Sequence, residues 1–115
     1  MASLAHFVEV LDHMAERPYM YFNDPSPFAL HYFVEGALYG MGNSTESQRF
    51  RAFINGFQNH VSTLYRHSDV SGWAAILAFR VPGELNAYRE TIRQMQLFYA
   101  DWKHAIISGQ PQSST

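Results

Sequence analysis

Apolar side chains between residues 45 and 66 recur at alternating steps of three and four, and this repeat limits the possible folds more than any other feature. The step matches the 3.6-residue turn of an α-helix and places the apolar side chains along one face. Thr45 and Gln48 have the spacing of a capping box at the start of this segment. The sequence therefore predicts a long amphipathic helix, whose stripe consists of Phe50, Phe53, Ile54, Phe57, Val61, Leu64 and Tyr65.

Four other segments have helical patterns, at about residues 3–17, 26–41, 73–80 and 84–107. Residues 73–81 are also compatible with a strand, because a short apolar run does not distinguish the two. The last segment has three heptads of an a/d pattern: Leu85, Tyr88, Ile92, Met95, Tyr99, Trp102 and Ile106. We predict an all-α, single-domain bundle of four to five helices over residues 1–107, and a disordered tail over residues 108–115.

The segment at residues 26–41 has apolar residues most of the way round, which is typical of a central, buried helix. Gly36 lies inside it, where glycine costs about 1 kcal/mol relative to alanine. We therefore expect a close helix–helix approach at Gly36. Glycines at positions 40 and 42, with Asn43, end the segment.

The stretch "ERPYMYFN", residues 16–23, places a proline and four large apolar or aromatic residues directly after the first helix. Pro18 should end that helix, with Arg17 over its negative C-terminal end. If the stretch is extended, Met20 and Phe22 point to one side and the two tyrosines to the other. We expect two of the aromatic side chains to fold inward and cover the bundle.

The composition excludes several classes of protein. The chain has no cysteine, which excludes disulfides, thiolate chemistry and cysteine-based zinc sites. The longest apolar run, residues 73–79, is far shorter than a membrane span, and the first residues lack the pattern of a signal peptide. We expect a cytoplasmic protein. Only 16% of the residues are charged while 47% are hydrophobic, which favours some exposed apolar surface and a partner.

Charge is distributed unevenly along the chain. Residues 1–46 contain six acidic residues and one basic residue, whereas residues 47–115 contain four acidic and seven basic ones. The overall charge of −2 lacks the clustered positive surface that nucleic-acid binding needs. The acidic half could attract a basic partner. Alternatively, it could pair within the fold or a dimer with the later arginines, namely Arg49, Arg51, Arg66, Arg89 and Arg93.

No cofactor or catalytic motif stands out. His6 and His13 are seven residues apart, as are His60 and His67, and neither spacing lets one helix turn present two metal ligands. We therefore predict no metal site and no cofactor, while a metal site assembled across helices remains an alternative. The acidic residues at positions 9, 12 and 16 form an exposed stripe, which lacks the enclosed setting that acid–base catalysis requires.

Residues 16–38, "ERPYMYFNDPSPFALHYFVEGAL", carry a resemblance that extends over about residues 4–102. The chain resembles a group of small bacterial proteins in which an Arg-Pro-Gly-Met-Tyr-Leu-Gly-like stretch ends the first helix. A helix with a Gly-Tyr-like pair and a Trp-centred segment follow. Tyr19 and Asn23 replace the usual glycines, and Ala37 replaces the usual aromatic residue. The matching residues are Arg17, Pro18, Met20, Tyr21, Gly36 and Trp73.

Members of this group are mostly uncharacterised, and some resemble immunity proteins of bacterial toxin systems. The resemblance implies a non-enzymatic protein that binds and neutralises a cognate toxin. We predict that the partner is a basic toxin domain, bound through Glu9, Asp12, Glu16, Tyr19, Asp24 and Glu35. One alternative is a homodimer held by the heptad face or by the helix at residues 26–41. Another is a ligand-binding or enzymatic bundle with a pocket formed by Tyr32, Phe57, Trp73 and Tyr99.

Overall fold

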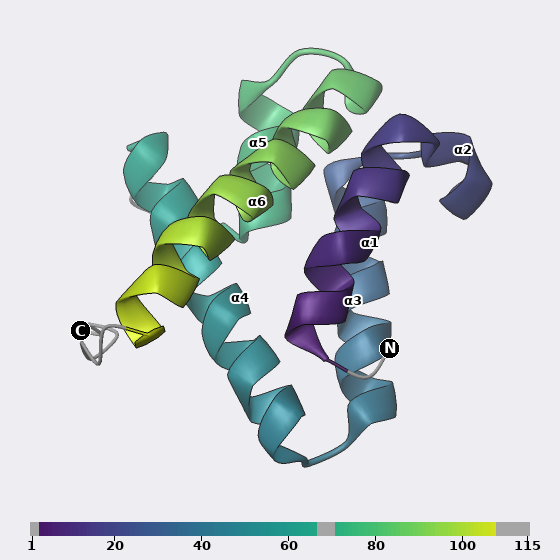
Figure 1. Ribbon diagram of the computed structural model, residues 1–115. Helices are drawn as coiled ribbons and strands as arrows, with labels where there is room; N and C mark the ends of the chain where they lie inside the picture. Colours follow the sequence, from purple (N-terminus) through teal and green to yellow (C-terminus); the bar gives the residue numbers. More distant parts are fainter. Residues whose placement is uncertain (1–2, 67–70, 108–115) are drawn as a thin grey trace.

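The computed structural model describes residues 3–66 and 71–107, with side chains up to residue 104, and within these ranges it contains helices and no strand (Figure 1). The six helices are α1 (Leu4–Glu16), α2 (Pro18–Tyr21), α3 (Pro27–Met41), α4 (Thr45–Leu64), α5 (Trp73–Arg80) and α6 (Glu84–Ile107). The predicted all-α single domain is confirmed, and residues 73–80 are helix. The additional helix is the single turn α2. The predicted tail at residues 108–115 lies outside the described residues.

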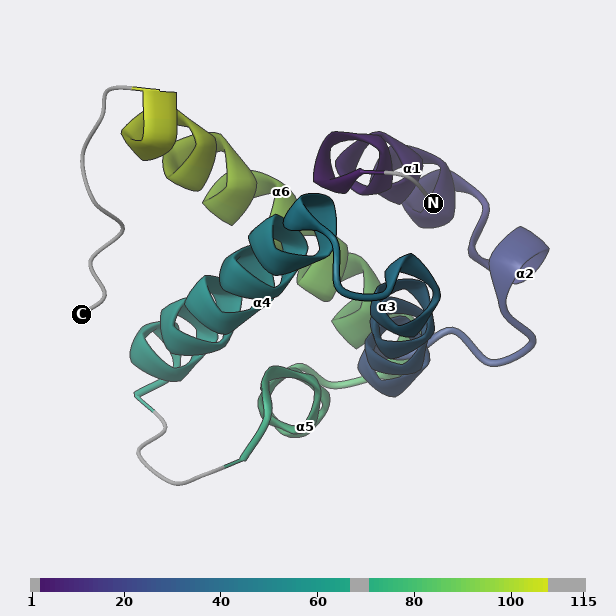
Figure 2. The same cartoon turned by 90° about the horizontal axis from the view of Figure 1, so that it is seen from below.

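Helix α6 is the central element of the bundle, because it packs against α1, α3, α4 and α5. Figure 2 looks nearly along the axes of α3 and α5, while α4 and α6 run across the view. The short α5 packs against α3, α4 and α6. The bundle is therefore not a set of parallel helices, and it measures 38 × 32 × 22 Å.

The predicted apolar stripes of α4 and α6 contribute eight of the 20 buried apolar residues of the core. On α4 the buried members are Phe50, Phe53, Phe57 and Val61. On α6 they are Tyr88, Ile92, Met95 and Trp102. Four of the seven predicted a/d positions of α6 are thus buried within this chain, which packs other helices against them.

Helix α4 begins at a different cap from the one predicted. Ser44 is the N-cap, and its hydroxyl accepts a hydrogen bond from the Ser47 N–H at 3.1 Å. The Ser47 hydroxyl in turn accepts one from the Ser44 N–H, also at 3.1 Å, which completes a capping box. The predicted box of Thr45 and Gln48 is wrong by one residue. Serine replaces the usual Glu or Gln at its last position, which hides the motif in the sequence.

Helix α3 is less buried than its apolar composition predicted. Leu30, Val34 and Leu38 face the core, whereas Phe28, Tyr32 and Tyr39 are exposed. A Cβ at Gly36 would meet nothing within 4 Å, so the expected close approach is absent there. The close approach occurs on α4 instead, where the ring of Phe98 lies 2.8 Å from the position of a Cβ at Gly56.

The stretch after α1 is helical and not extended. The φ and ψ angles leave the helix at Arg17, and Pro18 then starts the one-turn α2. Met20 and Tyr19 are 69% and 68% exposed, so the predicted alternation of Met20 with the tyrosines is wrong. Of the aromatic residues in this stretch, Phe22 packs on the core, with its ring 5.9 Å from that of Tyr88, and the two tyrosines do not. The expectation of two inward aromatic side chains is therefore wrong. In a helical turn the side chains point around the axis and do not alternate between two sides. On α2 three consecutive large residues, Tyr19, Met20 and Tyr21, are exposed.

Candidate functional site

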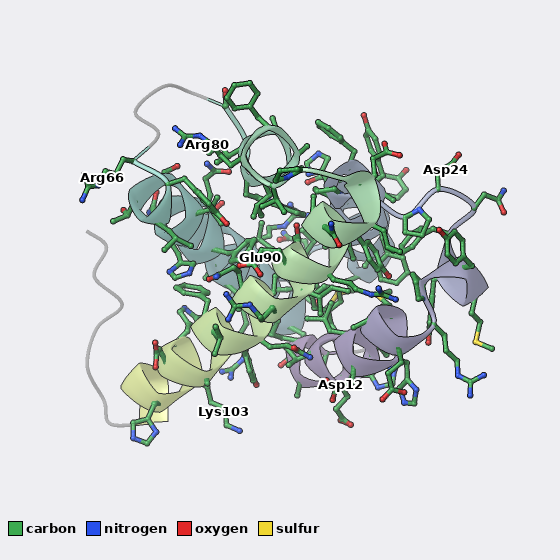
Figure 3. The ribbon with its side chains drawn as sticks, turned by 90° about the horizontal axis from the view of Figure 1, so that it is seen from above. Asp12, Asp24, Arg66, Arg80, Glu90 and Lys103 are labelled. Atoms are coloured by element: carbon green, nitrogen blue, oxygen red, sulfur yellow. The ribbon has the colours of Figure 1, made fainter. Side chains whose placement is uncertain are left out.

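The predicted partner-binding residues are all exposed, but they do not form one site. Glu9, Asp12 and Glu16 lie along the solvent face of α1, as the helical spacing predicted. Asp12 accepts a hydrogen bond from the side-chain amide of Gln96 on α6, at 2.6 Å. Asp24 lies in the segment before α3, and Figure 3 shows it on a part of the surface well away from Asp12.

The acids of the first half form no ion pair with the part of the chain that the structure describes. Among residues 3–66 and 71–104, the ion pair is Arg93–Glu90, and both of its members belong to α6. Arg49 lies over the ring of Trp102, 5.3 Å from its centroid, and Arg89 donates to the Ala15 carbonyl oxygen at 3.4 Å. Pairing of these arginines with the first-half acids inside the fold is therefore wrong for the described residues, while pairing across a dimer stays a prediction.

Like Asp12, Glu46 is a first-half acid that accepts a hydrogen bond from another helix. The Glu46 carboxylate accepts a hydrogen bond from the Leu4 N–H at 3.2 Å, a donor at the start of α1 that has no partner within the helix. Glu46 also lies in the first turn of its own helix α4, where a negative charge is favourable. The side chains of Glu9, Glu16, Asp24 and Glu35 make no hydrogen bond or ion pair with the described residues.

The outer face of α3 is aromatic. Phe28, Tyr32, Glu35 and Tyr39 recur at steps of four, three and four, so their side chains share one side of the helix. Tyr32 is 69% exposed and Tyr39 is 88% exposed. We call these four residues the aromatic face. It combines large rings with one carboxylate, and it lies opposite the buried Leu30, Val34 and Leu38.

A pocket of about 410 Å³ opens beside the aromatic face, between α3, α4 and the start of α5. Phe28, Tyr32 and Glu35 line it from α3, and Trp73 from α5. His31 also lines it, and its ring contacts Tyr32 and Trp73 edge-on with centroids 5.3 and 5.6 Å apart. Helix α4 contributes Ile54, Asn55 and Gln58.

The pocket overlaps in part with the aromatic pocket considered as an alternative from the sequence. Tyr32 and Trp73 line it as expected. Phe57 is fully buried behind it, with its ring 5.5 Å from that of Trp73. Tyr99 packs against Phe53 and Trp102 and does not line the pocket. Of the six predicted binding residues, the pocket contains Glu35.

Gln58 holds the α4 and α5 sides of this pocket together. Its side-chain oxygen accepts the Trp73 N–H at 2.6 Å, and its amide nitrogen donates to the Ser71 carbonyl and the Ser62 hydroxyl, each at 3.1 Å. Gly72, the N-cap of α5, has no side chain to serve this role. Gln58 therefore acts as the cap of a neighbouring helix, and both of its amide hydrogens are used inside the protein.

A second polar cluster joins α4 to α6. The Gln94 amide nitrogen donates to Glu90 at 2.9 Å, which leaves the Gln94 oxygen to accept from His60 Nε2 at 3.0 Å. The hydrogen bonds from Arg93 lower the pKa of Glu90, against the effect of its partial burial. Burial raises the pKa of the nearby Tyr65 hydroxyl, and the Glu90 charge adds to this increase. These residues tie two helices together, and none of them lines the pocket.

Two further questions from the sequence concern metal ligands and membrane-spanning helices. Among the described residues, no group of three or more His, Cys, Asp and Glu side chains is placed to hold a metal ion. His67 lies outside the described residues. None of the helices in the described ranges has the length and apolar character needed to cross a bilayer.

Sequence reasoning missed most of the pocket residues. Asn55 and Gln58 are polar positions on α4 with no motif around them, and His31 is one of six scattered histidines. The only available signal was the apolar excess of α3, whose rings exceed the number that one buried stripe can hold.

Comparisons with protein-family models, with curated proteins and with solved structures found no match to this chain.

Proposed function

We propose that this protein is a non-enzymatic module that binds another protein, and that its partner is a toxin domain with a basic surface. The toxin and the bacterial origin rest on the sequence resemblance alone, and the proposed cytoplasmic location rests on the composition. The binding role has independent support from the surface of α2 and α3. Two properties are argued in turn, namely the exposed rings of that surface and the unpaired negative charge of the first half of the chain.

The aromatic face is the observation that carries the proposal. Tyrosine and phenylalanine rings bury a large area with few rotatable bonds, which is why tyrosine is enriched among the residues that dominate binding energy. Tyr39 is 88% exposed and Tyr32 is 69% exposed. On α2, which precedes α3 in the chain, Tyr19 and Met20 are exposed to a similar degree. A partner that covered these rings would remove much apolar surface from water.

Unpaired acids supply the complementary charge. Glu9, Glu16, Asp24 and Glu35 are exposed and make no ion pair with the described residues, and the acidic half contains Arg17 as its one basic residue. Carboxylates without internal partners attract a basic surface and increase the rate of association at low salt. The exposed rings would then supply most of the affinity.

The test is binding of the native protein and two variants to the toxin encoded by the neighbouring gene. A double variant, Tyr32→Ala with Tyr39→Ala, removes rings from the aromatic face and should weaken binding by about a hundredfold, as expected for two contacts of this kind. A second, Glu9→Lys with Glu16→Lys, should mainly slow association and reduce its dependence on salt. Leu97→Ala on α6, which removes another exposed apolar side chain, is the control and should bind like the native protein.

Unchanged affinity in the tyrosine variant would overturn the assignment of the face. The homodimer alternative makes a different prediction for the same variant. The homodimer alternative named two helices, α6 and α3. Because four a/d positions of α6 are buried within the chain while Phe28, Tyr32 and Tyr39 of α3 are exposed, α3 is the helix that would join two copies. Light scattering would then show a dimer that the Tyr32→Ala, Tyr39→Ala variant converts to a monomer, with no toxin present.

A further inference from the structure

Some polar groups of the pocket beside the aromatic face are hydrogen-bonded within the protein, and others are open to a ligand. Both amide hydrogens of Gln58 are used by Ser62 and Ser71, and its oxygen accepts from Trp73, so Gln58 keeps one acceptor lone pair. The other polar side-chain groups of the lining residues make no hydrogen bond with the described residues: the Glu35 carboxylate, the Asn55 amide, the His31 ring, the Tyr32 hydroxyl and the Trp73 indole N–H. No lysine or arginine lines the pocket. Its one formal charge is therefore negative.

The walls of the pocket are π surfaces. Phe28, Tyr32 and Trp73 line it together with the imidazole of His31, which is packed edge-on between the last two. Aromatic faces attract cations, and the attraction grows when the cation is partly removed from water. A planar guanidinium gains further, because it stacks on rings and donates two parallel hydrogen bonds to a carboxylate.

A volume of about 410 Å³ is at the lower end of the range for small-ligand pockets. The geometry points to a binding site for the guanidinium of an arginine side chain, held between the rings and the Glu35 carboxylate. This assignment rests on the proposed function insofar as the arginine belongs to the protein partner. The binding of arginine itself requires no partner.

A neighbouring hollow limits what can flank this arginine. It has a volume of about 180 Å³, shares Glu35, Ile54 and Asn55 with the pocket, and is also lined by Arg51 and Leu38. A second cation there would lie beside Arg51 and be repelled. The site thus fits a single arginine with a neutral or acidic neighbour.

The test uses the ¹⁵N-labelled protein and two small probes. N-acetyl-arginine amide should give saturable NMR shifts at the Trp73 amide and indole and at the Asn55 side-chain amide. N-acetyl-citrulline amide has the same shape without the charge, and it should bind at least about tenfold more weakly. Equal binding of the two probes, or no saturable shift with arginine, would overturn the assignment.

Glu35→Gln is the matched variant, because Glu35 is exposed and makes no internal hydrogen bond that folding could lose. It should reduce arginine affinity by about tenfold and leave citrulline affinity unchanged. Arg51→Gln should not weaken arginine binding, and Glu9→Gln, on α1, should have no effect. An Arg affinity that is insensitive to Glu35→Gln would contradict the proposed contact.

The two proposals fail separately. Tyr39 does not line the pocket, so the Tyr39→Ala change alone tests the aromatic face against the toxin without touching the arginine site. Saturable, Glu35-dependent arginine binding together with no toxin binding would uphold the pocket and remove the proposed function. Toxin binding that depends on Tyr39, with no probe binding, would do the reverse.

Discussion

The Tyr88 hydroxyl of α6 donates a hydrogen bond to the Met14 carbonyl oxygen of α1 at 2.9 Å. This carbonyl would ordinarily accept from the N–H four residues later, but that residue is Pro18, which has none. Tyr88 thus satisfies an acceptor that the proline leaves open. Arg89 Nε donates to the next carbonyl, at Ala15, over a longer 3.4 Å, just before the chain leaves the helix at Arg17. The end of α1 is therefore held by α6, 74 residues away in sequence.

Tyr88→Phe keeps the buried ring but leaves the Met14 carbonyl without its donor. We expect the free energy of unfolding to fall by about 1–3 kcal/mol, the usual result of a buried polar group left unpaired. Urea unfolding measured by circular dichroism would show it. Tyr39→Phe removes a hydroxyl from an exposed ring and should change stability by less than about 0.5 kcal/mol. Equal stabilities for the two variants would contradict the role of the Tyr88 hydroxyl.

Burial raises the pKa of Tyr88 to about 12, from an ordinary value of 10.0. The folded state therefore favours the neutral hydroxyl, and the resulting stabilisation is complete below pH 10 and is lost as the pH rises towards 12. We expect the native protein to lose stability over this interval more steeply than Tyr88→Phe does. Parallel unfolding curves at successive pH values test this, and identical slopes would exclude Tyr88 as the titrating group.

Gly56 and Gly36 make a matched pair for helix–helix packing. A Cβ at Gly56 would lie 2.8 Å from the ring of Phe98, which itself packs on Phe53 and Phe57. Gly56→Ala should destabilise the protein by about 1–2 kcal/mol, since the ring must move and this outweighs the better helix propensity of alanine. Gly36→Ala adds a Cβ in open space and should stabilise by about 0.5–1 kcal/mol. Thermal unfolding of both variants gives the comparison, and the same sign for both would contradict it.

The five long helices could be predicted because their signals are local. The apolar period that specifies α4 and α6 lies within those helices. The prolines that follow Arg17 and Ser26 are the first residues of α2 and α3. The start of α6 at Glu84 and its end at Ile107 match the predicted limits. The buried sides of α4 and α6 followed from the same period, although Leu64 of the predicted α4 stripe is 47% exposed.

The buried side of α3 and the pocket could not be predicted, because both depend on which helices become neighbours. Its apolar residues exceed one stripe, and sequence alone does not tell which of them α4, α5 and α6 will cover. The bond between Gln58 and Trp73 joins residues 15 apart on two helices, and no period in the sequence records it. The exposed acids were predicted correctly as a face of α1, whereas Glu35 belongs to another surface.

Gln58→Ala should loosen the start of α5. It removes the acceptor of the Trp73 N–H and the donor to the Ser71 carbonyl, so we expect a loss of about 1–3 kcal/mol. Gln58→Glu keeps the acceptor and loses the donor, and should fall between the native protein and the alanine variant. Hydrogen exchange of the Trp73 amide is the direct measurement, with Asn59→Ala on the exposed side of the same helix as control. Native-like protection of Trp73 in Gln58→Ala would refute the capping role.

The pKa of Glu90 is lowered chiefly by the hydrogen bonds from Arg93, so the folded state favours the charged carboxylate. Its contribution is present above the ordinary pKa of 4.5 and is lost as the pH falls through the lower value of the folded state. Glu90→Gln should therefore be less stable than the native protein at pH 7 and should lose less stability between about pH 5 and pH 3. Urea unfolding at these pH values measures both effects. Glu9→Gln, which removes an acid without a described partner, should retain the native dependence on pH. If Glu90→Gln kept the same dependence, the Arg93 contact would not stabilise the fold.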